Sequence, residues 1–335
     1  YPDSHDAGER MMAVVQALCA LPPRQGVGEA AAANLIRGWL DSIGITYLTQ
    51  YSDVADLPSP RSATLNLGDE QYSAPHVLPS SSVEGLISSS RTGFIKLGAD
   101  ELNSSGFDSI VFCNPHCSSP SQLFLFPVPA ISVASPLFNK AQQTYNNGRF
   151  TGFVHVDEMA FRGQNIIVGN STQTPRVLVV AHYDAIRMGA LDNASGVAVV
   201  LQLIQEMRDA AGIVFALCGT EEYPVGEGYN ALFRKNPLLK AVEKICVIDC
   251  VGSGQEEKFT VNLSDCYRDL LYAGFPVEQE IFDEVLNRLI LIMGCNGRSG
   301  FLQVAHSDAD VPSNLNPELL KQAFLCAYRE VFNAA

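Results

Sequence analysis

Three almost uninterrupted apolar segments lie in the second half of the chain, at Val177–Ala181, Ile213–Cys218 and Ile245–Val251. Between the first two, the apolar residues of Ser195–Met207 recur at helical spacing and form one stripe. Strands that are apolar on both faces are typical of a sheet that helices cover on both sides, and such sheets are mostly parallel. The pattern predicts an α/β fold with a mixed, mostly parallel central sheet and helices on both faces.

The segment from Tyr51 to Asp157 differs in character from the rest of the chain. Serine and proline are frequent there, and short apolar pieces alternate with turn residues. Two helical patterns before residue 50 would complete the layers around the predicted sheet. We therefore expect a larger domain formed by residues 1–50 and 158–335, with residues 51–157 inserted into it as a smaller β-rich domain.

The charge of the chain excludes some classes of function. Its 335 residues include 36 acidic and 22 basic side chains, which gives a formal net charge of −14. This balance disfavours binding to nucleic acid or to an anionic membrane surface, and no apolar run is long enough to span a bilayer. We expect neither nucleic acid nor membrane as a partner, and the sequence leaves the oligomeric state open.

The chain contains nine cysteines, and most of them lie in apolar segments. Unpaired cysteines in such settings behave as small hydrophobic residues and are typical of a reducing compartment. They favour a cytoplasmic protein, and export with removal of a leading segment is the alternative. Cys113 and Cys117 are expected to be free thiols or a disulfide rather than a zinc site, because no second pair of ligands follows them.

Polar residues of the kind that bind metals accompany each apolar segment. They are His182 and Asp184 after the first strand, Asp192 at the start of the following helix, Glu221 and Glu222 after the second strand, and Asp249 within the third. In an open α/β sheet, sites form outside the carboxyl ends of the strands, so we expect these side chains to converge. Imidazole and carboxylate groups without thiolate are suitable ligands for zinc.

The charges of these residues favour two zinc ions over one. Asp192, Glu222 and Asp249 supply about −3 and a bound hydroxide about −1, against about +4 from two zinc ions. A single zinc would leave surplus negative charge in a sheltered cleft, which is unfavourable.

Local geometry suggests how the remaining residues divide their roles. Side chains two positions apart on a strand share a face, so Asp184 is expected beside His182, where it can accept the second ring N–H. Glu221 and Glu222 are adjacent and would diverge on extended backbone. One of them can then bind metal while the other transfers protons.

Five motifs follow one another along the chain: His182-x-Asp184, Gly189-Ala190-x-Asp192-Asn193-Ala194-Ser195-Gly196, Glu221-Glu222, Asp249 and His306-Ser307-x-x-Asp310. In type and order they resemble the motifs of peptidase family M28. The resemblance covers about residues 9–50 and 160–335, and it implies a zinc peptidase domain with two zinc ions that removes N-terminal residues from peptide substrates. The insert resembles a protease-associated domain.

The resemblance also implies a role for each site residue. Asp192 would bridge the two metals, His182 and Asp249 would complete one zinc site, and Glu222 and His306 would complete the other. Glu221 would be the general base and acid, and Asp184 would be the partner of His182. Asp310 is expected to be structural.

Three alternative functions remain to be distinguished. The chain could be a glutaminyl-cyclase-like acyltransferase with one zinc, a carboxypeptidase of the same family, or a binding protein that has a peptidase fold and no activity. The number of metal ions per chain and the need for a free amine in the substrate separate these possibilities.

Overall fold

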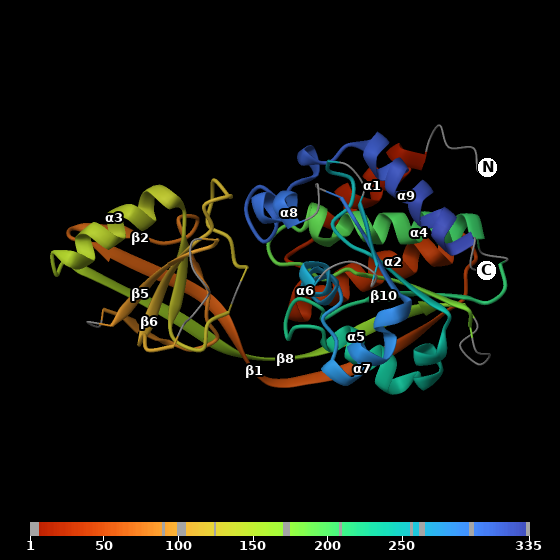
Figure 1. Ribbon diagram of the computed structural model, residues 1–335, viewed down its shortest axis with the longest axis horizontal. Helices are drawn as coiled ribbons and strands as arrows, with labels where there is room; N and C mark the ends of the chain where they lie inside the picture. The colour runs from red at the N-terminus through yellow and green to blue at the C-terminus, as the bar shows by residue number, and fades with distance from the viewer. Residues whose placement is uncertain are drawn as a thin grey trace. The chain divides into compact units, whose positions relative to one another are not determined.

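The computed structural model describes residues 7–88, 91–98, 105–123, 125–169, 175–207, 210–254, 257–260, 265–294 and 298–332. Its helices, shown in Figure 1, are α1 (Ala7–Cys19), α2 (Glu29–Ser42), α3 (Ser135–Asn146), α4 (Ser195–Met207), α5 (Glu227–Lys235), α6 (Asp265–Gly274), α7 (Gln279–Val285), α8 (Arg298–Val304) and α9 (Pro317–Phe332). Its strands are β1 (Tyr47–Leu67), β2 (Glu70–Tyr72), β3 (Val77–Pro79), β4 (Gly85–Ile87), β5 (Thr92–Lys96), β6 (Ser109–Cys113), β7 (Ala130–Val133), β8 (Phe150–Val168), β9 (Val177–His182), β10 (Ile213–Cys218), β11 (Lys244–Ile248), β12 (Glu257–Thr260) and β13 (Leu289–Met293).

Contacts along the chain define two compact units. The larger unit comprises Tyr1–Val54, Phe161–Phe301 and Asp310–Ala335, and the smaller one comprises Ala55–Ala160 and Leu302–Ala309. The smaller unit thus contains most of the segment that the sequence sets apart, together with a short C-terminal stretch expected in the larger domain.

The larger unit is built on a mixed sheet in the order β12-β13-β11-β9-β10-β8-β1. The neighbours β13, β11, β9 and β10 are parallel, whereas β12 runs antiparallel to β13 and β8 antiparallel to β10. Figure 1 shows α1, α4 and α9 on one side of these strands and α5 and α7 on the other. The predicted mixed, mostly parallel sheet between helices is therefore confirmed.

The core of the larger unit explains why its central strands are so apolar. Every residue of β9 and β10 is buried, as is almost every residue of α4. Helix α1 adds Met11, Val15 and Leu18 to this core and packs against α4 and α9. Strands covered on both faces bury side chains of both parities, so they lose the alternation that marks a half-exposed strand.

The smaller unit has its own sheet and its own core. The sheet has the order β3-β7-β6-β5, in which β6 is parallel to both neighbours. Helix α3 packs Phe138 and Ala141 into a cluster with Val111 and Ile131 of the sheet. A second, smaller β-rich part in addition to the central sheet is thus confirmed.

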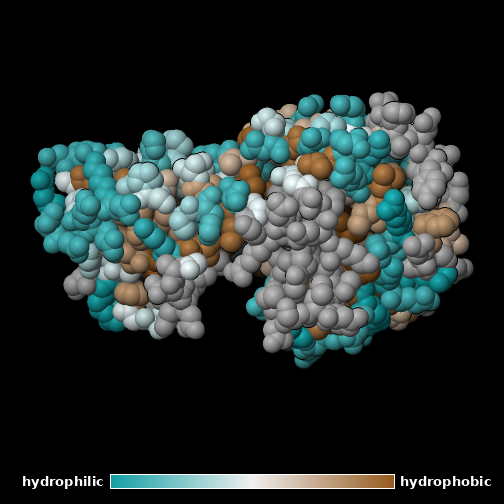
Figure 2. All heavy atoms as spheres, turned by 45° about the horizontal axis from the view of Figure 1, so that its top comes forward, coloured by the Kyte–Doolittle hydropathy of each residue, from teal (hydrophilic) through white to brown (hydrophobic). Residues whose placement is uncertain are grey.

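Cys113 and Cys117 in the smaller unit are free thiols. On the face shown in Figure 2, most of the described surface is hydrophilic, and hydrophobic side chains form small groups among the hydrophilic ones.

Within the part of the chain that the structure describes, none of the helices has the length and apolar character needed to cross a bilayer.

Candidate metal centre

The carboxyl ends of neighbouring strands meet at one end of the larger sheet. Cys218 pairs with His182, so β9 and β10 end at the same level. Val247 of β11 pairs with Val180 of β9, which brings Asp249, two residues further on, level with His182. β11 ends one residue before Asp249, so this acid follows the strand rather than lying within it. The register therefore places the loops after three strands side by side.

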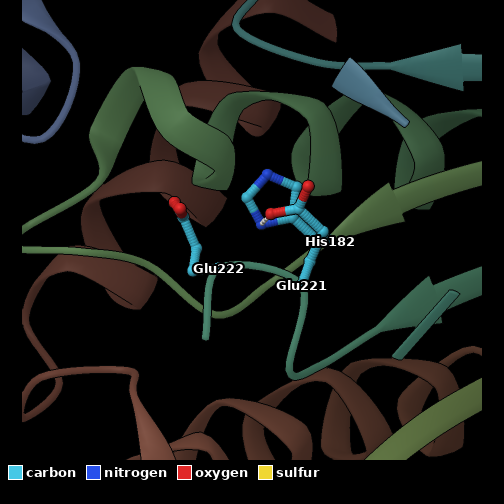
Figure 3. A group of neighbouring side chains, drawn as sticks. All are labelled: His182, Glu221 and Glu222. Atoms are coloured by element: carbon cyan, nitrogen blue, oxygen red, sulfur yellow. Dashed lines mark ion pairs between the residues drawn. The ribbon is translucent and has the colours of Figure 1, made fainter. Parts of the chain in front are cut away.

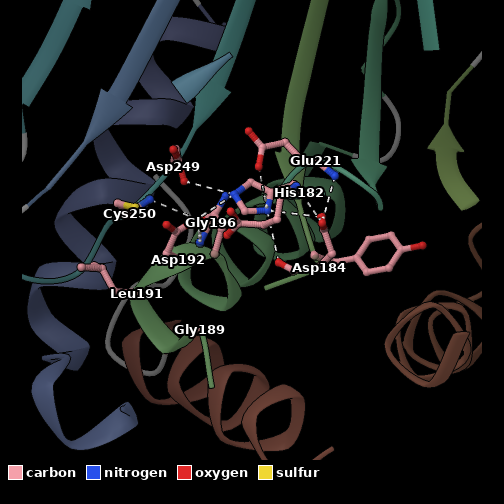
Figure 4. A network of polar contacts seen from close by, with 12 residues as sticks. His182, Asp184, Gly189, Leu191, Asp192, Gly196, Glu221, Asp249 and Cys250 are labelled. Carbon is pink, nitrogen blue, oxygen red and sulfur yellow. Dashed lines mark hydrogen bonds and ion pairs between the residues drawn. The ribbon is translucent and has the colours of Figure 1, made fainter. Parts of the chain in front are cut away.

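His182 lies at the centre of the group and is almost fully buried. Its Nε2 lies 3.2 Å from Oδ1 of Asp192 and 3.5 Å from Oδ1 of Asp249. Its Nδ1 lies 3.5 Å from Oδ1 of Asp184 and 3.8 Å from Oε2 of Glu221. Figure 4 shows the imidazole within this network of acids. One ligand atom each from His182, Asp192 and Asp249 lies within 4.8 Å of the other two.

The burial of several acids in one place shifts the pKa values of the site residues. Burial first, and then the charge of Asp192, raises the pKa of Asp249. Burial also raises the pKa of Glu221 well above its usual value, and neighbouring carboxylates add to the effect. Burial lowers the pKa of His182, but the surrounding acids, Glu221 first, outweigh it and leave that pKa well above its usual value. A bound cation would offset the repulsion among these acids.

Glu221 and Glu222 lie in a tight turn after β10 rather than on the extended backbone expected from the sequence. The chain enters the turn through Thr220, whose φ is +57°. A β-branched residue in this left-handed conformation costs about 1–3 kcal/mol, so the surrounding structure must hold it there. Figure 3 shows both glutamate side chains next to the imidazole of His182, and one ligand atom from each of the three residues lies within 4.8 Å of the others.

Asp184 supports both the histidine and the glutamate turn. Its Oδ1 faces the Nδ1 of His182, and its Oδ2 accepts hydrogen bonds from the backbone N–H groups of Glu221 and Glu222 at 2.9 and 2.8 Å. Only the first of these roles was expected from the sequence. Because the second depends on how the β9 and β10 loops meet, no local pattern could have indicated it.

Asn193 joins its own loop to the end of β11. Its Oδ1 accepts hydrogen bonds from the N–H of Gly196 at 2.9 Å and of Cys250 at 3.2 Å, and its Nδ2 donates to the carbonyl of Ile248 at 3.0 Å. Gly196 has no room for a side chain, since a Cβ there would lie 2.4 Å from the Ile248 carbonyl oxygen. Because Asp249 lies between Ile248 and Cys250, Asn193 fixes the backbone on both sides of that acid.

Ser195 and Asp310 hold the backbone next to Asp192. The Ser195 hydroxyl donates to the carbonyl of Leu191 at 2.7 Å and accepts from the N–H of Val251 at 3.1 Å. The buried carboxylate of Asp310 accepts the N–H groups of Leu191 and Asp192 at 2.5 and 3.2 Å. Both residues act on the backbone, which agrees with the structural role expected for Asp310.

Arg24 holds the loop after β9, although nothing in the sequence distinguishes it from a surface arginine. Its buried guanidinium donates to the backbone carbonyls of Tyr183, Met188 and Gly189, each at 2.8 Å. Its own carbonyl accepts the N–H of Ala185 at 3.1 Å. One side chain from before α2 therefore holds the loop that leads from the histidine to the next acid of the site.

Arg24→Met is expected to lower the free energy of unfolding by about 3 kcal/mol, because three backbone carbonyls, two of them in buried contacts, lose a charged donor. The midpoint of urea unfolding measures this loss. Arg61→Met is the matched control, since the Arg61 side chain is 68% exposed and its pair with Asp157 lies at the surface, where such pairs contribute about 0–1 kcal/mol. An Arg24→Met midpoint equal to that of the unmodified protein would show that other contacts hold the loop.

His306 lies in the stretch Leu302–Ala309, which belongs to the smaller unit. Within that unit its Nδ1 lies 3.1 Å from the carbonyl oxygen of Gln122, and its φ is +55°. Its assignment as a metal ligand therefore stays a prediction.

Solved structures with the same fold are numerous. The aminopeptidase from Aneurinibacillus sp. strain AM-1 is 17% identical, with a TM-score of 0.63 over 99% of this chain and 96% of that one. BSAP, a zinc aminopeptidase from Bacillus subtilis, is 15% identical, with a TM-score of 0.72 over 98% of this chain and 94% of that one. The glutaminyl cyclase from Bacteroides thetaiotaomicron is 13% identical, with a TM-score of 0.54 over 98% of each chain. At these identities the likeness shows the fold alone.

A comparison with curated proteins finds no matching sequence. Residues 165–284 match the profile described as "Peptidase family M28", and this range contains six of the seven predicted site residues, all but His306. This segment is therefore similar to peptidase family M28, and the solved structures share the fold of the whole chain.

Proposed function

We propose that this chain is a zinc-dependent aminopeptidase that removes N-terminal residues from peptides. The observation that carries the proposal is the convergence of four acids, Asp192, Asp249, Glu221 and Glu222, around the buried ring of His182. Family M28 peptidases and zinc aminopeptidases of the same fold support it.

The residues present fit a bound cation. Oδ1 of Asp249 is buried, makes no hydrogen bond with described residues and faces the ring of His182 only at the ion-pair distance of 3.5 Å. A buried carboxylate oxygen without a donor is unfavourable unless a cation compensates it. The donors are one imidazole and several carboxylates without thiolate, a set that zinc accepts.

We assign the metal ligands accordingly. His182 and Asp249 would hold one zinc, Glu222 would hold a second together with His306, and Asp192 would be shared between the two. With its Nδ1 toward Asp184, the ring of His182 would present Nε2 as the ligand atom.

When bound, zinc supplies a Lewis acid and lowers the pKa of water so that it can act as a nucleophile near neutral pH. Glu221 would take a proton from the attacking water and deliver it to the amine that leaves. Asp184 would keep this glutamate in place through the backbone N–H that it accepts at 2.9 Å. The acidic surroundings would also favour the positively charged α-amine of a substrate.

A free α-amine in the substrate is expected to be required. With zinc present, the protein should hydrolyse a peptide with a free N-terminus at least about 100-fold faster than the same peptide with an acetylated N-terminus. Mass spectrometry of the products shows which end was cut. Release of C-terminal residues from both peptides would instead identify a carboxypeptidase, and a protein that neither cleaves them nor binds a divalent metal would be a binding protein.

A glutaminyl cyclase is the second candidate, because one of the structures with this fold is such an enzyme. Elemental analysis of the purified protein should find close to two zinc ions per chain for the aminopeptidase and one for the cyclase. A peptide with N-terminal glutamine separates them independently. The aminopeptidase releases the glutamine, whereas a cyclase releases ammonia and leaves a cyclised N-terminus.

A further inference from the structure

Glu29, the first residue of α2, is a buried acid that the proposed chemistry does not use. Its side chain is almost fully buried. The hydroxyl of Thr220 lies against its carboxyl group, with Oγ1 2.9 Å from Oε2 and 3.2 Å from Oε1. An acid in the first turn of a helix usually lies at the surface, where it interacts with the helix dipole. The burial of Glu29 and its contact with another element therefore suggest a separate role.

Thr220 is enclosed on several sides in its left-handed conformation. Its carbonyl accepts the N–H of Gly228 at 2.8 Å. A Cβ on Gly163 would lie 2.4 Å from Thr220 Oγ1, and a Cβ on Gly219 would lie 2.5 Å from Glu29 Oε2. Because the two glycines have no side chains, the Glu29 carboxyl group and the Thr220 hydroxyl have just enough space to meet. The contact is therefore closely packed.

Two acids hold successive residues of the same turn. Glu29 accepts the hydroxyl of Thr220, and Asp184 accepts the next two backbone N–H groups, those of Glu221 and Glu222. We propose that Glu29 is a positioning residue that acts through Thr220 to orient the two glutamates of the turn. This inference rests on the proposed function, in which one glutamate transfers protons and the other binds zinc.

The hydrogen bond between Glu29 and Thr220 matters because the backbone of Thr220 is strained. A residue in the left-handed region stays there only while its surroundings hold it, so loss of the hydroxyl bond lets the backbone relax. Relaxation at Thr220 rotates the peptide group that follows and moves Glu221. Small displacements of groups that must be aligned for reaction lower the rate strongly. Loss of a residue that orients a metal ligand likewise lowers the affinity for the metal.

Four single variants and one double variant test the contact. Thr220→Val removes the hydroxyl and keeps the shape, and Thr220→Ser keeps the hydroxyl. Glu29→Met removes the acceptor, and Glu29→Gln keeps one. Burial, together with the charge of Asp184, raises the pKa of Glu29 to about 9, so the side chain is uncharged at neutral pH and glutamine resembles it closely.

Thr220→Val and Glu29→Met are each expected to weaken zinc binding about 10–100-fold, measured by competition with a chromophoric chelator. They should lower kcat by a similar factor and change KM less than about twofold. The double variant Thr220→Val/Glu29→Met should lose no more zinc affinity and kcat than either single variant, because both substitutions remove the same hydrogen bond. Thr220→Ser and Glu29→Gln should stay within about threefold of the unmodified protein.

Amide hydrogen exchange without added zinc is a readout that needs neither metal nor activity. The N–H groups of Glu221 and Glu222 should exchange faster in Thr220→Val and Glu29→Met, while those of the central strands stay protected. Glu318→Gln is the control, since Glu318 is also in the first turn of a helix but its side chain is 64% exposed. It should leave zinc affinity and exchange unchanged.

Unchanged exchange and zinc affinity in Thr220→Val, or losses that add up in the double variant, would overturn the positioning role. Faster exchange in a protein that cleaves no peptide would instead uphold that role and reject the proposed function. A protein that cleaves peptides equally well in all these variants would reject the positioning role alone.

Discussion

Glu221→Gln is expected to lower kcat about 10²–10⁴-fold and to leave the zinc content unchanged. The amide has nearly the shape of the carboxylate, but it cannot take the proton of the attacking water. The proposed ligands His182, Asp192, Asp249 and Glu222 are all retained, so the metal has no reason to leave. Steady-state kinetics on a free-amine peptide and elemental analysis of the same preparation measure the two effects.

Glu227→Gln is the matched control for this substitution. Glu227 lies six positions further along the chain, at the start of α5, and pairs with Arg234 at 2.6 and 2.7 Å; the two side chains are 28% and 48% exposed. Its variant should retain full activity. A Glu221→Gln protein as active as the unmodified one would disprove the assignment of the base, whereas one that has lost its zinc would show that Glu221 is a ligand.

Asp192→Asn is expected to abolish both zinc binding and turnover. It removes the negative charge that the two metals would share, and the neutral amide is a much weaker ligand for zinc. Zinc should stabilise the unmodified protein by about 2.7 kcal/mol when its free concentration is 100 times the dissociation constant, because it binds only the folded chain. The variant should show no such gain. Thermal unfolding with and without added zinc measures this difference directly.

Asp53→Asn serves as the control for that experiment. The side chain of Asp53 is 81% exposed and pairs with Arg162, itself 62% exposed, at 3.1 Å. It should keep the full response to zinc. If Asp192→Asn bound two zinc ions as tightly as the unmodified protein, the idea of a carboxylate shared between the metals would be untenable.

The central sheet was predictable because its strands are apolar throughout. Residues 177–181 and 213–218 leave no polar face, so only a sheet buried on both sides can accommodate them. The convergence of His182, Asp249 and Glu222 follows from the same fact, since parallel strands place their carboxyl ends together.

The supports of the site could not be predicted in this way. Arg24 and Glu29 come from the chain before and at the start of α2, and they meet loops more than 150 residues away. An isolated arginine after two prolines and an acid in a first helical turn resemble ordinary surface residues. Only their burial distinguishes them, and burial is a property of the packed structure.

By itself, the sequence was enough to predict which side chains would carry metal chemistry, since a candidate ligand is identified by its chemical type and by its place after an apolar strand. Tertiary structure alone decided what holds those side chains at working distances. The left-handed backbone at Thr220, the two acids that hold its turn, and the amide of Asn193 that spans two loops depend on contacts between distant segments. Such contacts have no local signature, because hydrogen bonds between loops become favourable only when packing has excluded water from both partners.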